Sequence, residues 1–351
     1  MNIQKIKFVS AQPDLPYFHW QTIVYVNNFI RHGINPRQIH VLFALQPKQV
    51  FSPNIEKLKQ DGVNFHYYDD NRKLRGYIPS IKPYLVSKWV SPNDIFFLHD
   101  SDIIFNYLPN FNKMEKDDVY LSDTRGYIGY NYIADCCQRY KDKYSYLKEL
   151  NLLDEMAKIV GIDIQMIKEN EMNSGGAQYL VSGTNADFWE KVYLDSEKLY
   201  SVMYNFNEKY RIDCPIQMWT AEMWSILWNF WKHGHNTRIV EELSFAWATD
   251  DIEKCNTNPI LHMAGITEDM KGNRFYKGDF MNCSPVDQLV LNPNFFDYVE
   301  KNSSSWKYVE DVKKFVGSSY LFENSRKMTE RCSNVDFLEF LNNFLEESDG
   351  K

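Results

Sequence analysis

The sequence predicts an α/β protein whose mixed, mostly parallel sheet is flanked by helices. Short apolar segments typical of buried strands alternate with longer amphipathic segments typical of helices. This alternation favours parallel strands, because such strands need a crossover connection between them. A chain of 351 residues is long enough for one large α/β domain or two ordinary ones, and no Gly/Ser/Pro-rich linker divides it.

The expected elements of the first hundred residues are strands and helices in turn. Strands are expected at 6–10, 39–44, 63–68 and 95–98, and helices at 20–31, 50–60 and 81–90. Ligands of open α/β sheets bind beyond the carboxyl ends of the strands. We therefore expect the functional site just after the fourth strand.

The later segments predict further strands and helices. Strands are expected at 119–122 and 178–181, and helices at 144–160, 185–204 and 215–231, the last starting at Pro215 because proline suits the first helical position. Residues 286–351 are expected to form a C-terminal helical extension. The predicted organisation is one domain over 1–285, divided into halves 1–105 and 106–285, followed by this extension.

Composition excludes several classes of protein. The 44% hydrophobic and 25% charged residues suit a globular protein, and no apolar run is long enough to span a bilayer. The start of the chain lacks the apolar core of a signal peptide, so we expect a cytoplasmic protein, in the host cytoplasm if its origin is viral. A net charge of −8 gives no overall attraction to nucleic acid or to an anionic membrane, although a local basic groove is compatible with it. The six cysteines lack metal-ligand spacing and are expected to be reduced and mostly buried.

The most informative motif is Asp100-Ser101-Asp102, which stands between the apolar runs 95–98 and 103–105. Two carboxylates at the mouth of a buried strand repel each other and resist desolvation unless a cation neutralises them. Mg²⁺ or Mn²⁺ is the expected cation, since both take oxygen ligands and leave positions open for substrate phosphates. The alternative for an isolated acidic pair is an exposed turn.

Two later motifs could complete a site with this pair. Asn173-Ser174-Gly175-Gly176 precedes an expected strand, and its glycines permit close approach to a ligand, although a plain β-turn is the more common explanation of a Gly-Gly pair. Glu222 lies in a helix dominated by large apolar side chains, so it either faces solvent or is held for acid/base chemistry. The tryptophans of this helix at helical spacing, Trp224, Trp228 and Trp231, are expected to be core residues.

His262 ends an apolar run and is followed by Gly265. A lone histidine of this kind is usually a core residue, but a neutral imidazole could complete the ligand set of the acidic pair. Lys82, Lys271 and Lys277 could offset phosphate charge, although surface lysines are the common case. The residues expected to contact a nucleotide ligand are Ser10, Gln12, Lys82, Ser101, Asn173, Gly175, Gly176, Gly265, Lys271 and Lys277.

Taken in order, these motifs resemble the GT-A class of nucleotide-sugar glycosyltransferases over residues 5–280. Within this class, residues 81–89 leading into 97–102 look like the hydroxyproline O-arabinosyltransferases and peptidyl-serine galactosyltransferases of plants and algae. The His262–Gly265 segment is also similar to the His-x-x-Gly motif of glycogenin-like enzymes. Those enzymes have a lysine three residues after the glycine, where this chain has Glu268, so Lys271 or Lys277 would have to replace it. The resemblance and the missing signal peptide together indicate a microbial or viral enzyme.

The resemblance implies a GT-A fold with a nucleotide-binding half over 1–105 and an acceptor half over 106–285. It implies that Asp100, Asp102 and His262 hold Mn²⁺ or Mg²⁺ against the diphosphate of a UDP-sugar. Glu222 would then be the base or a ligand of the donor sugar, with Asn173 and the glycine turn shaping the sugar pocket. The acceptor would be a hydroxyl of a glycan, a peptide or, as in phage enzymes, a hydroxymethylated DNA base.

Two other classes of protein remain as alternatives. Metal-dependent phosphohydrolases of the haloacid dehalogenase type also use Asp-x-Asp, but there the pair follows the first strand. A non-catalytic sugar-binding scaffold is the second alternative. The sequence indicates neither the donor sugar nor the oligomeric state.

Overall fold

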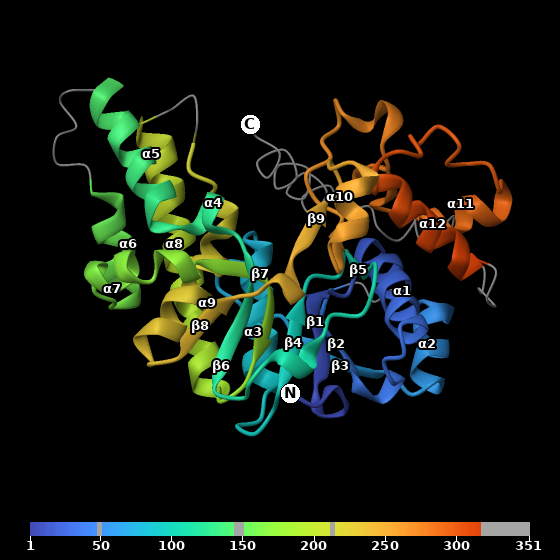
Figure 1. Ribbon diagram of the computed structural model, residues 1–351, viewed down its shortest axis with the longest axis horizontal. Helices are drawn as coiled ribbons and strands as arrows, with labels where there is room; N and C mark the ends of the chain where they lie inside the picture. The colour runs from blue at the N-terminus through green and yellow to red at the C-terminus, as the bar shows by residue number, and fades with distance from the viewer. Residues whose placement is uncertain (48–50, 144–150, 211–214, 317–351) are drawn as a thin grey trace.

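The structure is a computed structural model that describes residues 1–47, 51–143, 151–210 and 215–316. A seven-stranded sheet with the order β3-β2-β1-β4-β7-β6-β8 forms its centre (Figure 1). These strands are β1 (Lys7–Pro13), β2 (Ile39–Leu45), β3 (Asn64–Asp69), β4 (Phe96–His99), β6 (Asp118–Asp123), β7 (Gly175–Val181) and β8 (Asn236–Ile239). Neighbouring strands pair in parallel except at β7, which runs antiparallel to both β4 and β6. The predicted mixed, mostly parallel sheet is therefore confirmed.

Alternation along the strands divides the apolar side chains between two cores. Phe8 and Phe97 belong to the core on one face of the sheet, whereas Val9 and Leu98 belong to the core on the other. All four side chains are fully buried. Because successive strand residues point to opposite faces, a sheet covered on both sides requires continuous apolar runs. This is the pattern from which the strands were predicted.

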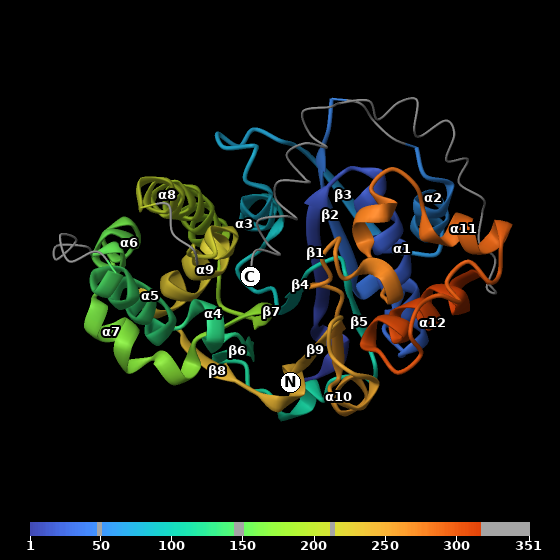
Figure 2. The same ribbon diagram turned by 90° about the horizontal axis from the view of Figure 1, so that it is seen from above.

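Helices cover both faces of the sheet (Figure 2). On one side lie α1 (Pro16–Arg31) and α2 (Pro53–Gln60), together with the C-terminal helices α11 (Pro285–Leu291) and α12 (Ser304–Val316). On the other side lie α3 (Ile81–Trp89), α8 (Ala186–Tyr210) and α9 (Ala221–Lys232), and beyond them α4 (Arg125–Ile128), α5 (Tyr130–Lys143), α6 (Leu152–Val160) and α7 (Ile164–Glu169).

A second sheet with the order β5-β10-β9 stands beside the first. It contains β5 (Ile103–Phe105), β9 (Phe245–Trp247) and β10 (Ile260–His262), with α10 (Ile252–Thr257) between the last two. β10 pairs antiparallel with β5 and parallel with β9. Since β4 and β5 are separated only by residues 100–102, the acidic motif joins the two sheets.

The described part of the C-terminal extension packs on the first helix. Asp311 of α12 accepts a hydrogen bond from Asn28 at 2.9 Å and lies 2.6 Å from the Arg31 guanidinium. Residues 317–351 of this extension lie outside the described residues. The boundary at residue 285 and the halves meeting at residue 105 therefore remain predictions.

Several element boundaries differ from those expected. β1 runs on to Pro13, three residues past the expected end, and α1 begins at Pro16 rather than Trp20. α9 begins at Ala221 and not at Pro215, because the backbone N–H and C=O of Ile216 bond the Asn207 side chain instead of a helical partner.

Other differences concern whole elements. α5 and the short strands β5, β8, β9 and β10 were not among the expected elements. Residues 144–150 of the helix expected at 144–160 lie outside the described residues, and α6 covers the remainder.

Two expectations from composition are tested directly. Cys136, Cys137 and Cys255 are free and buried, and Cys283 is free and half-buried, whereas Cys214 and Cys332 fall outside the described residues. Over the described ranges, no helix has both the length and the apolar character needed to cross a bilayer.

The sheet carries a pH-sensitive pair of histidines away from the acidic motif. His40 on β2 stacks on His66 of β3, and their ring nitrogens lie 3.1 Å apart. Burial lowers the pKa of His40 to about 4, with His66 and Lys7 adding to the effect. A histidine whose folded-state pKa lies below its unfolded value binds protons more readily in the unfolded chain, so acid favours unfolding.

We expect the contribution of His40 to the free energy of unfolding to be complete above pH 6.5 and to be lost as the pH falls toward 4. The expected loss is on the order of 2 kcal/mol. Urea unfolding of wild type and His40→Gln at pH 7 and pH 4.5 measures it, and the variant should lose less stability than wild type. The matched control is His233→Gln at an exposed position. Equal losses in wild type and His40→Gln would contradict the assignment.

Candidate active site

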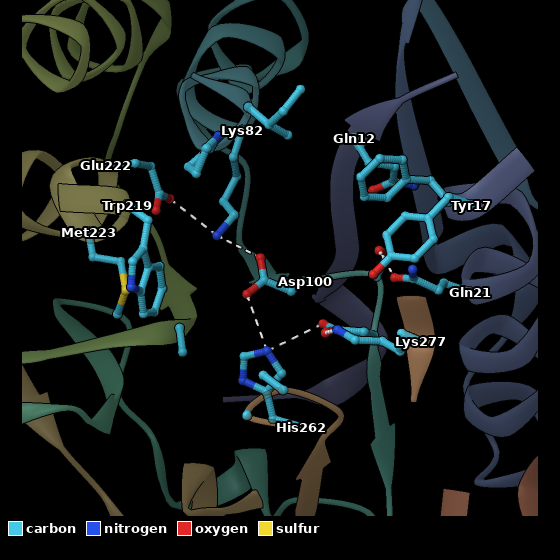
Figure 3. Close-up of a pocket in the computed structure, with 18 of the residues that line it drawn as sticks. Gln12, Tyr17, Gln21, Lys82, Asp100, Trp219, Glu222, Met223, His262 and Lys277 are labelled. Atoms are coloured by element: carbon cyan, nitrogen blue, oxygen red, sulfur yellow. Dashed lines mark hydrogen bonds and ion pairs between the residues drawn. The ribbon is translucent and has the colours of Figure 1, made fainter. Parts of the chain in front are cut away.

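A pocket of about 460 Å³ lies beyond the carboxyl ends of β1 and β4. Its walls come from segments far apart in the chain, which Figure 3 shows converging on one centre. The polar side chains that line it include Gln12, Tyr17, Gln21, Lys82, Asp100, Ser101, Asp102, Glu222, His262 and Lys277. The position agrees with the general rule for ligands of open α/β sheets.

Strand pairing brings His262 to the acidic motif. β10 pairs with β5 so that His262 lies opposite Ile103, the residue after Asp102. The backbone N–H of Met263 also donates to the carbonyl oxygen of Asp102 at 2.9 Å. These main-chain hydrogen bonds therefore bring the backbone of His262 next to the acidic motif.

The three side chains form a geometry that suits a hard divalent cation. His262 Nε2 lies 3.3 Å from Asp102 Oδ1 and 3.7 Å from Asp100 Oδ2. One ligand atom from each residue falls within 4.8 Å of the others. Ligand atoms at right angles around an ion with bonds of about 2.1 Å lie roughly 3 Å apart, so small movements would suffice to coordinate Mg²⁺ or Mn²⁺. Two carboxylates and an imidazole are also a suitable donor set for these ions.

Each aspartate additionally contacts a lysine. Lys82 Nζ lies 2.7 Å from Asp100 Oδ1, and the Lys277 ammonium contacts Asp102 Oδ2. Burial alone would raise the pKa of Asp102, but Lys277 and His262 outweigh it and hold that pKa well below its usual value. Asp102 is therefore ionised at neutral pH, as a metal ligand must be.

The imidazole is oriented by groups behind it. Gln178 Nε2 lies 3.5 Å from His262 Nδ1, and the Ser122 hydroxyl lies 2.6 Å from Gln178 Oε1. Trp247 stacks on the His262 ring, with the two ring centroids 5.4 Å apart. Such partners commonly fix the ring of a metal-binding histidine. Sequence analysis did not select Gln178, because a glutamine inside an apolar strand carries no motif.

Glu222 is buried and faces the pocket. Its residue exposure is 2%, and Oε1 lies 3.2 Å from Lys82 Nζ, so the solvent-facing alternative is wrong. Burial raises the pKa of Glu222 to about 7 despite the opposing effect of Lys82. A carboxyl with this pKa can gain or lose a proton in neutral solution, as a general acid or base requires. The tryptophans Trp224, Trp228 and Trp231 on the same helix are core residues, as predicted.

Lys82 joins the two acidic positions rather than standing free for a ligand. It is 6% exposed and lies between Asp100 and Glu222 (Figure 3). Burial alone would lower the pKa of Lys82, but the two carboxylates outweigh it and raise that pKa above its usual value. The positive charge of Lys82 is therefore already partly neutralised by these two carboxylates.

The opposite wall carries two amides with unused hydrogen-bonding atoms. Gln12 Nε2 donates to Thr22 Oγ1 at 3.2 Å, and Ser101 Oγ donates to Gln21 Oε1 at 2.7 Å. Gln12 Oε1 and Gln21 Nε2 are buried and have no hydrogen-bond partner. Tyr17 lies between them (Figure 3). An unpaired acceptor and donor on one wall of a pocket indicate a ligand edge with the complementary groups.

Some residues predicted to contact a ligand do not line the pocket. Ser10 points away and its hydroxyl lies 2.6 Å from Tyr25 Oη, because β1 continues past it and Gln12 takes the position at the strand end. Lys271 is tied to Glu268 and Asp279 at the surface.

The Asn-Ser-Gly-Gly segment also has a packing role. Asn173 uses its backbone carbonyl to accept from Thr237, and it does not line the pocket. Gly175 and Gly176 belong to β7 and are not a separate turn before it. A Cβ on Gly175 would meet Ser122 O at 2.6 Å, and one on Gly176 would meet Met223 Cε at 2.5 Å. These glycines permit close packing under the pocket wall. Ser101, Gly265 and Lys277 do line the pocket, and Gly265 has a left-handed φ of 88°.

Comparisons with known proteins give remote matches only. No protein-family model and no curated protein matches the chain. The solved structure of the bifunctional glycosyltransferase WbbM shares 10% identity with a TM-score of 0.45, and covers 93% of this chain and 51% of its own. The chain therefore spans about half the length of that protein.

Two further solved structures are similar at the same low level. The galactosyltransferase LgtC, in complex with donor and acceptor sugar analogues, shares 12% identity with a TM-score of 0.41, covering 92% of this chain and 100% of its own. Mouse xyloside xylosyltransferase 1 shares 8% identity with a TM-score of 0.36, covering 74% and 97%. These values establish no family, so the function is inferred from the chain's own pocket.

We expect Asp102→Asn and His262→Ala to weaken binding of Mn²⁺ alone by at least tenfold, because each removes one donor atom from the triad. Electron paramagnetic resonance titration of free Mn²⁺ measures this without any substrate. Asp94→Asn is the matched control, since it also removes a carboxylate paired with a lysine, Lys7, far from the triad. Unchanged Mn²⁺ affinity in both triad variants would exclude the proposed ligand set.

Proposed function

We propose that the protein is a metal-dependent glycosyltransferase of the GT-A class that transfers a sugar from a UDP-sugar to an acceptor hydroxyl. The observation that carries this proposal is the order of groups across one pocket. The Asp100, Asp102 and His262 triad stands in the middle, between an amide and aromatic wall and a wall with Glu222 and Trp219 (Figure 3). A nucleoside diphosphate sugar has the same order of parts, which are a base, a charged diphosphate and a sugar.

Charge at the centre supports a diphosphate ligand. Asp100, Asp102 and Glu222 face the two ammonium groups of Lys82 and Lys277. With all three carboxylates ionised, the cluster carries one net negative charge, and a divalent cation would make it positive. Mn²⁺ or Mg²⁺ held by the triad would stabilise negative charge developing on the departing diphosphate. Lys277, which contacts Asp102 and lines the pocket, is the lysine proposed to contact phosphate oxygens.

The amide wall supports uracil as the base. Uracil presents an N–H donor beside carbonyl acceptors, which complement the free Gln12 Oε1 and Gln21 Nε2. Tyr17 and Phe18 also line this wall and offer ring faces for stacking. The proposed nucleotide-binding half, residues 1–105, supplies all four side chains.

Glu222 is proposed to take the proton of the acceptor hydroxyl. In this step the acceptor oxygen bonds to the anomeric carbon, the bond from that carbon to the diphosphate breaks, and the hydroxyl proton passes to the carboxylate. Lys82 holds Glu222 and Asp100 on the same side of the pocket. Trp219 and Met223 flank this position and present apolar surface to a sugar ring.

The donor sugar and the acceptor are proposed from the resemblance of the motifs. The hydroxyproline arabinosyltransferases suggest a pentose such as arabinose or a hexose, with a peptide or glycan hydroxyl as the acceptor. Incubation of the protein and Mn²⁺ with UDP-sugars and pools of glycans, peptides and hydroxymethylated DNA, followed by mass spectrometry, tests the proposal. Sugar transfer or metal-dependent release of UDP supports it. Absence of both with every UDP-sugar would leave a sugar-binding scaffold as the better account.

We expect Glu222→Gln to lower turnover about 10²-fold with little change in the affinity for UDP, because the amide cannot accept the proton. Initial rates and calorimetric UDP affinity measure the two effects. Glu197→Gln is the matched control, because Glu197 is also a buried glutamate but does not line the pocket. Near-normal turnover of Glu222→Gln would remove this residue from the chemistry.

We expect UDP to bind at least tenfold more tightly than CDP, since cytosine presents an acceptor and an amine where uracil presents a donor and a carbonyl. Gln21→Leu removes the free donor and should reduce this preference to a few-fold. Gln217→Leu, a change at another residue that lines the pocket, two positions before Trp219, should leave the preference intact. Competition calorimetry in Mn²⁺ measures both ratios. Equal UDP preference in wild type and Gln21→Leu would contradict the assignment of the base.

A further inference from the structure

The start of helix α9 lacks the side-chain cap that a helix of this kind normally has. Thr220 precedes Ala221 but makes no capping hydrogen bond, because its hydroxyl donates to Gln217 O at 2.6 Å and accepts from Trp224 Nε1 at 3.1 Å. The first backbone N–H groups of a helix have no partner within the helix. Glu222 is the second residue of α9, so its N–H needs an acceptor from elsewhere.

Tyr77 supplies this acceptor from another part of the chain. Glu222 N donates to the Tyr77 hydroxyl at 2.8 Å, and the same hydroxyl donates to Trp219 O at 2.8 Å. One side chain therefore bonds the backbone on both sides of Thr220. Burial, with the Glu222 carboxylate adding, raises the pKa of Tyr77 well above its usual value, so the hydroxyl remains protonated and able to donate.

The position of Tyr77 is itself fixed by buried contacts. Its ring stacks on Tyr200 of α8 with centroids 4.2 Å apart, and it is 1% exposed. The buried guanidinium of Arg72 donates to Tyr77 O at 2.7 Å and to Ser80 Oγ at 2.8 Å. The same guanidinium pairs with Asp70 at 3.0 Å. Residues 70–80 are thus folded around one buried charge, and Ile78 and Pro79 of this segment line the pocket.

We propose that Tyr77 is a positioning residue that caps α9 and sets the placement of Glu222 and Trp219 for sugar transfer. Neither the metal triad nor the amide wall touches the Tyr77 hydroxyl in the described structure. Loss of this hydroxyl should therefore impair the chemical step and spare donor and metal binding. This inference rests on the proposed function of Glu222.

Tyr84 offers a matched control on the same side of the sheet. Its hydroxyl also donates to a backbone carbonyl, Asp69 O at 2.8 Å, and also accepts from a backbone N–H, Asn71 N at 3.3 Å. Its ring packs on the ring of Tyr193 in α8, with the two centroids 5.2 Å apart. Tyr84→Phe thus removes the same two kinds of bond from the same loop region without touching α9.

The test compares Tyr77→Phe with Tyr84→Phe in the full chain. We expect Tyr77→Phe to lower kcat at least tenfold, with KM for the UDP-sugar and Mn²⁺ affinity within about twofold of wild type. We expect Tyr84→Phe to keep wild-type kcat. Amide hydrogen exchange over residues 219–224 should become faster only in Tyr77→Phe, which reports the cap without any substrate.

The outcomes separate the inference from the proposed function. Wild-type kcat in Tyr77→Phe, an equal fall in Tyr84→Phe, or an equal loss of donor affinity would overturn the positioning role. If Glu222→Gln retains normal turnover, the proposed role of Glu222 fails, and a fall in kcat for Tyr77→Phe could then no longer be assigned to Glu222. If the wild-type protein transfers no sugar, the proposed function fails, and unchanged exchange over 219–224 would still overturn the cap.

Discussion

The neutralisation of buried carboxylates is the constraint on which this site depends. Asp102 and Glu222 are each less than a tenth exposed, and Asp100 lines the same pocket. Charges in such a position are costly unless they are paired. Lys82 meets this requirement for Asp100 and Glu222, and Lys277 does so for Asp102. Because each lysine comes from a different element, the charges hold α3, α9 and the segment after β10 around one centre. Burial raises the pKa of Glu222, and Lys82 offsets this effect only in part, which explains why that pKa is near neutrality.

The strands of the first hundred residues and the grouping of Asp100, Asp102 and His262 could be predicted from sequence for simple physical reasons. β4 is buried along its whole length, and β1 and β2 are buried over most of theirs, so these strands contain the apolar runs from which they were predicted. An acidic pair at the end of such a buried run is costly unless its charges are neutralised. His262 could be selected because it ends a similar run. The closeness of His262 to the two aspartates depends on the pairing of β5 with β10. This pairing could not be predicted, because a strand of three residues is too short to show a recognisable alternation of apolar and polar side chains. The apolar face of α5 was also too weak a signal beside its many polar residues.

Other parts of the site depend on side-chain placement that no motif records. Gln21 and Gln178 were missed because their importance comes from which atom is left without a partner or which ring they touch. Ser10 was selected together with Gln12 because the end of β1 was placed at Ser10 instead of Pro13. Lys271 and Lys277 are indistinguishable in sequence. Only the turns after β10 bring Lys277 to Asp102 and tie Lys271 to surface carboxylates.

The pairing of β5 with β10 also bears on when the site exists during synthesis of the chain. β1 pairs with β2, and β2 with β3, which are the next strands in sequence, whereas β5 must wait for residues 260–262. Contacts between distant segments carry a larger loop-closure cost and form late. Until β10 emerges, Asp100 and Asp102 lack both His262 and Lys277, and the edge of β5 has no partner strand. A nascent chain therefore carries the Asp102 carboxylate without its lysine, and an open strand edge, until the segment after β10 has been made. Such a surface is the kind that chaperones protect.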